Sequence, residues 1–187
     1  MHFFQEMDEG ILLFFQSIHN DELDYFFWHV SEALIFLPLW IFALIRVIKE
    51  YNKTEYIKIL VIIVLSIFLS DQISNVFKNT IKRERPTHNE KYYDKIKLVN
   101  NYKGGKYGFY SAHASNSAAI AVLTLLLIKK SRWKYIIILY PLLSGISRMY
   151  LGVHYFSDVL VGWIMGSMIA IFVYWLINKW WVLNKHQ

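Results

Sequence analysis

The sequence contains no cysteine, so disulfide bonds and thiolate metal sites are excluded at once. It also has no internal repeat, no low-complexity segment and no basic low-complexity tail. A formal net charge of +6 can indicate binding to nucleic acid or to an anionic surface. Because no recognisable nucleic-acid motif accompanies that charge, we expect no nucleic-acid partner. No cluster of carboxylates suits a hard metal ion, so we expect neither a metal nor another cofactor.

Apolar and aromatic residues are abundant instead. Of the 187 residues, 56% are hydrophobic and 18% are aromatic, which is more than a soluble domain of this size usually contains. A helix needs roughly 20 mostly apolar residues to cross a bilayer. Five runs approach that length: Trp28–Ile45, Ile57–Val76, Ala114–Ile128, Trp133–Tyr150 and Val159–Ile177. The sequence therefore predicts an all-α, polytopic membrane helix bundle with five transmembrane helices, in one domain that spans residues 1–187.

The N-terminal stretch differs from these five runs. Glu6, Asp8 and Glu9 interrupt it. It has neither a basic start nor a small-residue cleavage site, so we do not expect a signal peptide. Its apolar side chains can share one side of a helix: Phe3, Phe4, Met7, Ile11, Leu12, Phe14 and Phe15. This pattern predicts an amphipathic helix at the membrane interface. A helix packed against the protein would have the same pattern, and the two interpretations are compatible.

The connections between the runs predict how the chain is oriented. With five spans, the long polar segment 79–110 and the connection 147–158 lie on the same side of the membrane. The short loops and the C-terminal tail lie on the other side and carry basic residues with few acidic neighbours: Arg46, Lys49, Lys53, Lys58, Lys129, Lys130, Arg132, Lys134, Lys179 and Lys185. The first 45 residues contain acids but no lysine or arginine. Under the positive-inside rule, the short loops are predicted to be cytoplasmic and the long segment to lie outside.

Three clusters of polar residues fall on the predicted outer side. They contain Lys78 and Arg85, then Ser111 and His113, and then Arg148, His154 and Asp158. Ionisable residues at the ends of membrane helices are costly, which makes them candidates for function. Although the clusters are far apart in the sequence, we expect them to meet at one membrane face.

The residue types in these clusters suit phosphate chemistry. Lys78, Arg85 and Arg148 can hold an anion with three equatorial oxygens, because arginine offers forked donors and lysine a compact charge. Asp158 follows His154 by four residues, so its carboxylate can hold one ring nitrogen and leave the other free as a nucleophile.

A second imidazole and a hydroxyl group complete the set. His113 is available as a general acid. Ser111 lies where the third run begins, and free backbone N–H groups are available at the start of a helix. An anion cradle, a nucleophile with its orienting partner and a proton donor are the parts that phosphoryl transfer requires.

The spacing of these residues resembles the three motifs of the type 2 phosphatidic acid phosphatase superfamily. The matching stretches are "KNTIKRERP", "YSAH" and "SRMYLGVHYFSD", within residues 78–166. The resemblance implies an all-α bundle and metal-independent hydrolysis through a phosphohistidine. The implied roles are phosphate binding by Lys78, Arg85 and Arg148 with Ser111 and the backbone of Ala112, protonation of the leaving group by His113, attack on phosphorus by His154, and orientation of His154 by Asp158.

The middle motif departs from the usual Pro-Ser-Gly-His pattern of this superfamily. Here Tyr110 and Ala112 stand at the proline and glycine positions. In the superfamily, the N–H at the glycine position commonly helps to bind phosphate. Ala112 keeps that donor but tolerates fewer backbone conformations. Because Ser111 and His113 remain, we predict an active enzyme.

We therefore predict hydrolysis of a lipid phosphate or diphosphate at the outer face of a bacterial inner membrane, with undecaprenyl diphosphate favoured. Phosphatidylglycerol phosphate, phosphatidic acid and lipid A stay open as substrates. Transfer of the phosphate to another lipid and the oligomeric state also stay open. A haloperoxidase is disfavoured because those members are generally soluble. A binding or transport protein would not need the pair His154 and Asp158.

The remaining features have simpler interpretations. The other basic residues of the long segment are interpreted as a solvated loop face or a surface for lipid headgroups: Lys82, Arg83, Lys91, Lys95, Lys97, Lys103 and Lys106. Gly162 and Gly166, four residues apart, indicate close packing between helices. Asp71 lies two turns before Lys78 and either supports it or satisfies polar groups inside the bundle.

Overall fold

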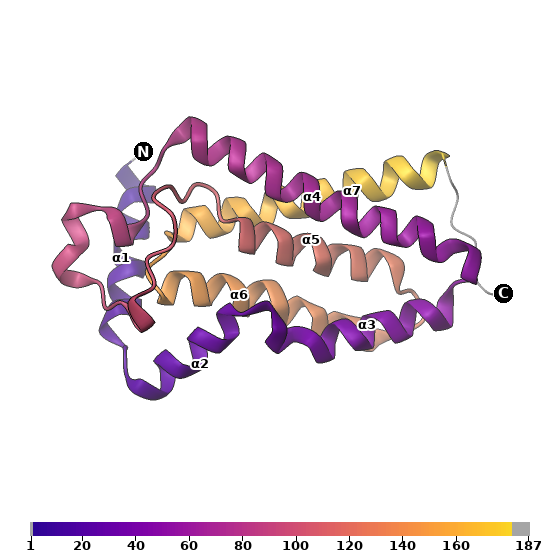
Figure 1. The fold of residues 1–187 in the computed structure, drawn as a ribbon, viewed down its shortest axis with the longest axis horizontal. Coiled ribbons are helices and arrows are strands. Elements are labelled where there is room, and N and C mark those ends of the chain that lie inside the picture. The colour runs from indigo at the N-terminus through magenta and orange to yellow at the C-terminus, as the bar shows by residue number, and fades with distance from the viewer. Residues whose placement is uncertain (1, 181–187) are drawn as a thin grey trace.

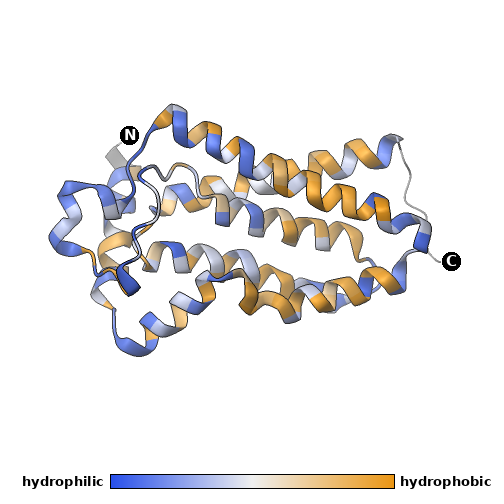
Figure 2. Cartoon of the chain, in the orientation of Figure 1, coloured by the Kyte–Doolittle hydropathy of each residue, from blue (hydrophilic) through white to orange (hydrophobic). Residues whose placement is uncertain are grey.

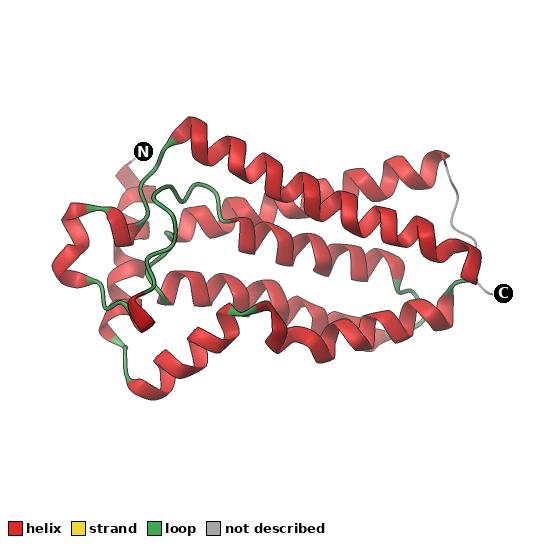
Figure 3. Cartoon of the chain, in the orientation of Figure 1, coloured by secondary structure: helices red, strands yellow, loops and turns green. Residues whose placement is uncertain are grey.

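The computed structural model describes residues 2–180, which form helices and no β-strand (Figure 3). The seven α-helices are α1 (His2–Ser17), α2 (Asp21–Ser31), α3 (Leu37–Glu50), α4 (Tyr56–Ile81), α5 (Ala112–Leu127), α6 (Leu139–Tyr150) and α7 (Phe156–Trp180). The short 3-10 helices are η1 (Ala33–Phe36), η2 (Lys53–Glu55), η3 (Pro86–His88), η4 (Glu90–Lys95), η5 (Val99–Asn101) and η6 (Arg132–Ile138). Residue 1 and residues 181–187, which include Lys185, lie outside the described part of the chain, as do the side chains of His2 and Phe3.

The long helices α3 to α7 run along the long axis of the molecule (Figure 1). At the left-hand end of Figure 1, α1, α2 and the long segment between α4 and α5 gather together. The connection from α3 to α4 lies at the opposite end. The fold therefore brings the N-terminal helix and the long polar segment to the same end of the bundle.

The outer surface of the bundle is apolar. Figure 2 shows hydrophobic residues along the long helices and hydrophilic residues at the two ends. Large apolar side chains are exposed on three helices: Ile41 and Leu44 on α3, Leu60 and Val64 on α4, and Ile171 and Phe172 on α7. Soluble proteins rarely expose apolar surface on this scale. The protein is therefore an integral membrane protein, as predicted.

The membrane crossings are less regular than the hydropathy of the sequence suggests. Within residues 2–180, two stretches are long and apolar enough to cross a bilayer alone, Lys53–Ile81 and Phe156–Trp180. The helices Asp21–Ser31 and Ala33–Glu50 pass the same test only as a pair, bent by 76°. The predicted run Trp28–Ile45 is therefore wrong as one continuous helix, because the chain turns where the backbone of Glu32 is extended.

The other two predicted runs also have distinct shapes. The run Trp133–Tyr150 is divided between η6 and α6, and since a 3-10 helix rises more per residue than an α-helix, the two together reach about 32 Å. The helix α5 reaches only about 24 Å, which is shorter than a hydrocarbon core of about 30 Å. Most of its side chains are buried among neighbouring helices, so α5 need not match the lipid thickness.

Small residues let α5 and α7 pack closely, as Gly162 and Gly166 predicted. A Cβ atom on Gly166 would lie 1.9 Å from the carbonyl oxygen of Ser115, and one on Gly162 would lie 2.7 Å from that of Ser111. On the other side of α5, the hydroxyl groups of Ser115 and Ser70 are 2.6 Å apart. Both contacts fix the height of α5 in the bundle.

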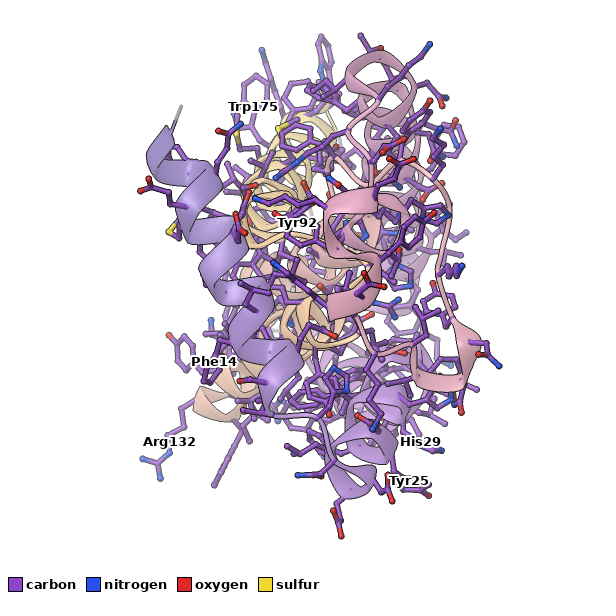
Figure 4. The ribbon with its side chains drawn as sticks, turned by 90° about the vertical axis from the view of Figure 1, so that its left-hand side faces the viewer. Phe14, Tyr25, His29, Tyr92, Arg132 and Trp175 are labelled. Atoms are coloured by element: carbon purple, nitrogen blue, oxygen red, sulfur yellow. The ribbon has the colours of Figure 1, made fainter. Side chains whose placement is uncertain are left out.

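The N-terminal helix α1 packs on the end of the bundle. Figure 4 looks onto this end, with α1 along one side, the long segment along the other and Tyr92 between them. Leu12 is buried against Tyr92 and Tyr155. Phe4 and Phe14 are 54% and 58% exposed. One side of α1 thus packs against the rest of the protein. The contact of α1 with the membrane interface stays a prediction.

Candidate active site

The start of α5 provides backbone donors. Ser111 is the N-cap, and its Oγ accepts a hydrogen bond from the N–H of Ala114 at 3.4 Å. Ala112 is the first residue of the helix and His113 the second. The first N–H groups of a helix have no partner within it, and the helix dipole favours an anion there. The predicted middle motif therefore forms the N-terminus of a central helix.

His154 and Asp158 lie at the junction between α6 and α7. His154 is buried in the connecting loop, and its Nδ1 is 3.4 Å from Oδ2 of Asp158. Asp158 is fully buried in the first turn of α7, and the same oxygen accepts the N–H of Tyr155 at 3.1 Å. The Nδ1 side of the ring thus faces the carboxylate. Burial lowers the pKa of His154 to about 4, although Asp158 acts to raise it, so the imidazole is neutral at pH 7.

The ends of the long segment pair with each other and position Arg85. The N–H of Arg85 donates to the carbonyl of Lys106 at 3.0 Å, and that of Gly108 donates to the carbonyl of Arg83 at 2.9 Å. The Nε of Arg85 also donates to the carbonyl of Tyr107 at 3.2 Å. The segment starts at Lys82, whose left-handed conformation (φ 52°) ends α4. This sharp turn directs the chain back across the end of the bundle.

Arg148 lies in the last turn of α6 with its side chain buried. Its Nη2 donates to the carbonyl of Ser31, at the end of α2, at 2.7 Å. Its Nε has no hydrogen-bond partner in the part of the chain that the structure describes. A buried donor without a partner is costly, and an anion bound beside Arg148 would satisfy it.

The predicted residues converge on one place. Lys78, near the end of α4, together with Arg85 and Arg148, acts electrostatically on the imidazole of His113, as does His154. The N–H of Ser111 donates to the backbone carbonyl of Asp158 at 3.0 Å, which joins α5 directly to α7. The structure therefore brings the residues of all three predicted clusters to the end of the bundle that carries α1 and the long segment.

Arg83 was missed, and its interpretation as part of a solvated loop face is wrong. Its guanidinium donates to Oδ1 of Asp158 and to Oδ2 of Asp8, each at 2.7 Å. Burial disfavours its charge, but Asp158 and Asp8 outweigh burial and raise its pKa. A signal was present, because residues two apart in an extended segment face the same side, and Arg83 precedes Arg85 by two.

The contacts of Asp71 and of three lysines in the long segment agree with the interpretations drawn from the sequence. Asp71 accepts a hydrogen bond from Asn75 at 3.2 Å and interacts electrostatically with Lys78. Lys91, Lys97 and Lys106 are 56%, 50% and 59% exposed and form ion pairs at the surface. These three lysines fit a solvated loop face.

Comparison with known proteins gives the family. The sequence model of the PAP2 superfamily matches residues 58–181. A lipid A 4'-phosphatase of Bacteroides thetaiotaomicron is 31% identical over 181 residues, which cover 96% of this chain and 80% of that protein. A lipid A 4'-phosphatase of Porphyromonas gingivalis is 30% identical over 175 residues, which cover 93% and 74%.

A solved structure has the same fold. The transmembrane PAP2-type phosphatidylglycerolphosphate phosphatase from Bacillus subtilis aligns with a TM-score of 0.70 and 24% identity, covering 94% of this chain and 86% of that one. The helical bundle, the matched region and the near full-length relatives agree with one another. The chain belongs to the PAP2 superfamily of type 2 phosphatidic acid phosphatases, and it is a membrane lipid phosphatase, a phosphoric ester hydrolase.

Proposed function

We propose that the protein removes a phosphate group from a membrane lipid through a phosphohistidine formed on His154. The observation that carries this proposal is the placement of one neutral, buried imidazole between a carboxylate, Asp158, and a group of cations. A neutral imidazole has the lone pair that nucleophilic attack requires. The cations stabilise the charge that develops on the transferred phosphoryl group.

The first step transfers the phosphoryl group to the enzyme. The Nε2 lone pair of His154 attacks phosphorus, and the bond between phosphorus and the lipid oxygen breaks. His113, which takes up a proton when the phosphate anion binds beside it and offsets the surrounding cations, gives that proton to the oxygen, so the lipid leaves as an alcohol. Lys78, Arg85 and Arg148 hold the phosphoryl oxygens.

The second step releases phosphate. Water attacks the phosphorus of the phosphohistidine, and His113, now neutral, takes a proton from that water. The phosphorus–nitrogen bond breaks, and His154 recovers its lone pair. Inorganic phosphate leaves, and both histidines return to their starting protonation states. Asp158 holds the His154 ring in the same orientation through both steps.

Lipid A is our first candidate substrate. Two relatives that match nearly the full chain are named lipid A 4'-phosphatases, so a phosphate monoester carried on a lipid-anchored sugar is the substrate class that similarity favours. Undecaprenyl diphosphate, which the sequence analysis favoured, stays a prediction. Both lipids present a phosphate group at a membrane surface, so a direct comparison of turnover is required.

The test is phosphate release from a panel of purified lipids in detergent. The panel contains lipid A, undecaprenyl diphosphate, phosphatidylglycerol phosphate and phosphatidic acid, each with excess EDTA. We expect release to persist in EDTA, to be fastest with lipid A and to disappear in His154→Ala. Vanadate should inhibit, because it adopts a five-coordinate shape like that of the transition state. Loss of activity in EDTA that Mg²⁺ restores would contradict the mechanism. Faster turnover of another lipid would contradict only the substrate.

We also propose that the bundle crosses a bacterial inner membrane five times, with α1 at the interface and the active site on the outer face. The basic short loops and the acidic first 45 residues support this orientation. Since the chain has no cysteine, single cysteines report the side directly. Asp94→Cys should react with an impermeant thiol reagent in spheroplasts, and Asn52→Cys only after lysis. The reverse pattern would place the site in the cytoplasm.

A further inference from the structure

Arg83 connects three elements of the fold that are distant in the sequence. It belongs to the long segment, and its guanidinium binds Asp158 on α7 and Asp8 on α1. The Nη1 of Arg83 donates a further hydrogen bond to the hydroxyl of Ser157 at 2.7 Å. The guanidinium carbon also lies 4.0 Å from the centre of the Tyr155 ring. Arg83 is thus held from several sides.

Asp8 is an unusual residue for the packed side of a terminal helix. It is only 3% exposed. Its Oδ1 accepts the N–H of Ser157 at 2.8 Å, and its Oδ2 accepts the hydroxyl of Ser157 at 2.6 Å. Asp8 therefore satisfies backbone and side-chain donors at the N-terminus of α7 in addition to binding Arg83. This turn of α7 is the one that carries Asp158.

We propose that Arg83 is a positioning residue that holds the Asp158 carboxylate toward His154, and that Asp8 makes α1 a part of the catalytic apparatus. The proposal rests on the proposed function, in which His154 is the nucleophile and Asp158 orients it. Neither Arg83 nor Asp8 touches the reacting atoms in this scheme. Both act through Asp158.

The hydrogen bonds of Asp158 show why Arg83 matters. Its Oδ2 accepts the N–H of Tyr155 and faces Nδ1 of His154, while its Oδ1 accepts a hydrogen bond from Nη1 of Arg83. A buried carboxylate that loses a charged partner is strongly destabilised. Without Arg83, the Asp158 carboxylate would keep its negative charge but lose the contact that fixes its orientation. The His154 ring would then be held less firmly.

An arginine suits this position better than a lysine. Its planar fork reaches two carboxylates at once, with Nη1 on Asp158 and Nη2 on Asp8. A lysine offers one compact charge on a flexible stem. Arg83→Lys should therefore keep the charge but lose part of the geometry.

The pH dependence of the reaction reports this arrangement. The groups that act on His154 are Asp158 from α7, Arg85 from the long segment, Arg148 from α6 and His113 from α5. Asp158 raises the pKa of His154, while burial and the two arginines lower it. Removing the charge of Arg83 leaves the negative charge of Asp158 less compensated. The acid limb of kcat/KM should then move to higher pH.

The experiment compares variants on one lipid substrate across pH. Arg83→Gln should lower kcat by about 10- to 100-fold, since small misplacements of reacting groups have effects of that size, with little change in KM. Its acid limb should move to higher pH, and Arg83→Lys should restore both properties in part. Asp8→Asn should cause a smaller loss of kcat. The double variant should be no slower than Arg83→Gln alone, because both changes break one chain of contacts.

A matched control is available on the same two elements. Lys91 of the long segment forms an ion pair with Glu9 of α1 and does not contact Asp158. Lys91→Gln should keep the wild-type rate and pH profile. A comparable loss in Lys91→Gln would show that any α1 contact is merely structural, and would overturn the proposal.

The outcomes separate this proposal from the proposed function. Thermal unfolding in detergent identifies variants that fold, and if Arg83→Gln does not, Asp8→Asn carries the test. An inactive His154→Ala beside a folded Arg83→Gln with wild-type kcat and acid limb would overturn the role of Arg83 alone. Additive losses in the double variant would overturn the chain of contacts. An active His154→Ala would instead overturn the proposed function.

Discussion

Gly108 lies directly against His154, so that a Cβ atom on Gly108 would be 3.4 Å from the Nδ1 of that histidine. The same atom would be 3.2 Å from Oδ2 of Asp158 and 2.9 Å from Cγ of Arg85. The long segment can close over the two catalytic candidates only because this position has no side chain. Gly108 is buried, and its N–H is fixed by the carbonyl of Arg83.

Gly108→Ala is therefore expected to reduce kcat by about 10- to 100-fold without unfolding the protein. The added methyl group must push Arg85 or the His154–Asp158 pair away from its place. Gly105→Ala is the control, because a Cβ atom there meets no heavy atom within 4 Å among residues 2–180. Phosphate release and thermal unfolding of both variants provide the measurement. Equal activity of the two variants would contradict the expectation.

The acid limb of the pH–rate profile should lie at low pH. His154 must be neutral to attack, and its pKa is lowered to about 4 by burial, so protonation should stop the reaction only near that pH. Substrate phosphate itself titrates near pH 6. Asp158→Asn separates the two effects, because Asp158 raises the pKa of His154. In Asp158→Asn, an acid limb due to His154 should move to lower pH, whereas an acid limb due to the substrate phosphate should stay where it is. Recovery of activity at pH 7 after exposure to acid excludes irreversible unfolding.

The two histidines should respond differently to the leaving group. A lipid alkoxide leaves poorly without a proton, whereas a nitrophenolate leaves readily. His113→Ala should therefore be severe with a lipid monophosphate and milder with nitrophenyl phosphate, recovering much of the roughly 10²–10⁴-fold that general acid catalysis contributes. His154→Ala should be inactive with both. Equal losses for His113→Ala on the two substrates would contradict its assignment as the acid.

The contact between α5 and α7 should control stability. Gly166→Ala would place a Cβ atom 1.9 Å from the backbone oxygen of Ser115. The helices must separate, at a cost of about 1–3 kcal/mol typical of overpacking, and the unfolding temperature in detergent should fall. Gly10→Ala is the control, because Gly10 is exposed on α1 and a Cβ there meets no described heavy atom within 4 Å. An unchanged unfolding temperature for Gly166→Ala would show that the two helices are not tightly packed.

The sequence was informative where chemistry depends on local spacing. His154 and Asp158 are four residues apart, and the predicted contact is present at 3.4 Å, although His154 lies in the loop before α7 and not in the helix itself. The two glycines of α7 likewise predicted a close contact between helices. Hydropathy identified the two stretches of the described chain that are long and apolar enough to cross a bilayer alone, Lys53–Ile81 and Phe156–Trp180, because apolar content does not depend on the rest of the fold.

Features that depend on distant partners could not be predicted in this way. Arg83 is a site residue because Asp8 lies 75 positions earlier and Asp158 75 positions later. Hydropathy averages over a window and is insensitive to backbone direction, so it could not detect the turn at Glu32. The role of Gly108 follows from what surrounds it, and a glycine in a loop gives no local signal of that.

The hydrogen bond from Arg148 to the carbonyl of Ser31 has a consequence for product release. A phosphate group that uses the same donor must displace the carbonyl, so part of its attraction to Arg148 is offset. A lipid substrate adds contacts through its apolar chains, but inorganic phosphate has none to add. In the proposed site, the Ser31 carbonyl at the end of α2 thus competes with phosphate for one donor of Arg148. Because only a lipid substrate offsets this competition with apolar contacts, we expect turnover to continue while inorganic phosphate accumulates.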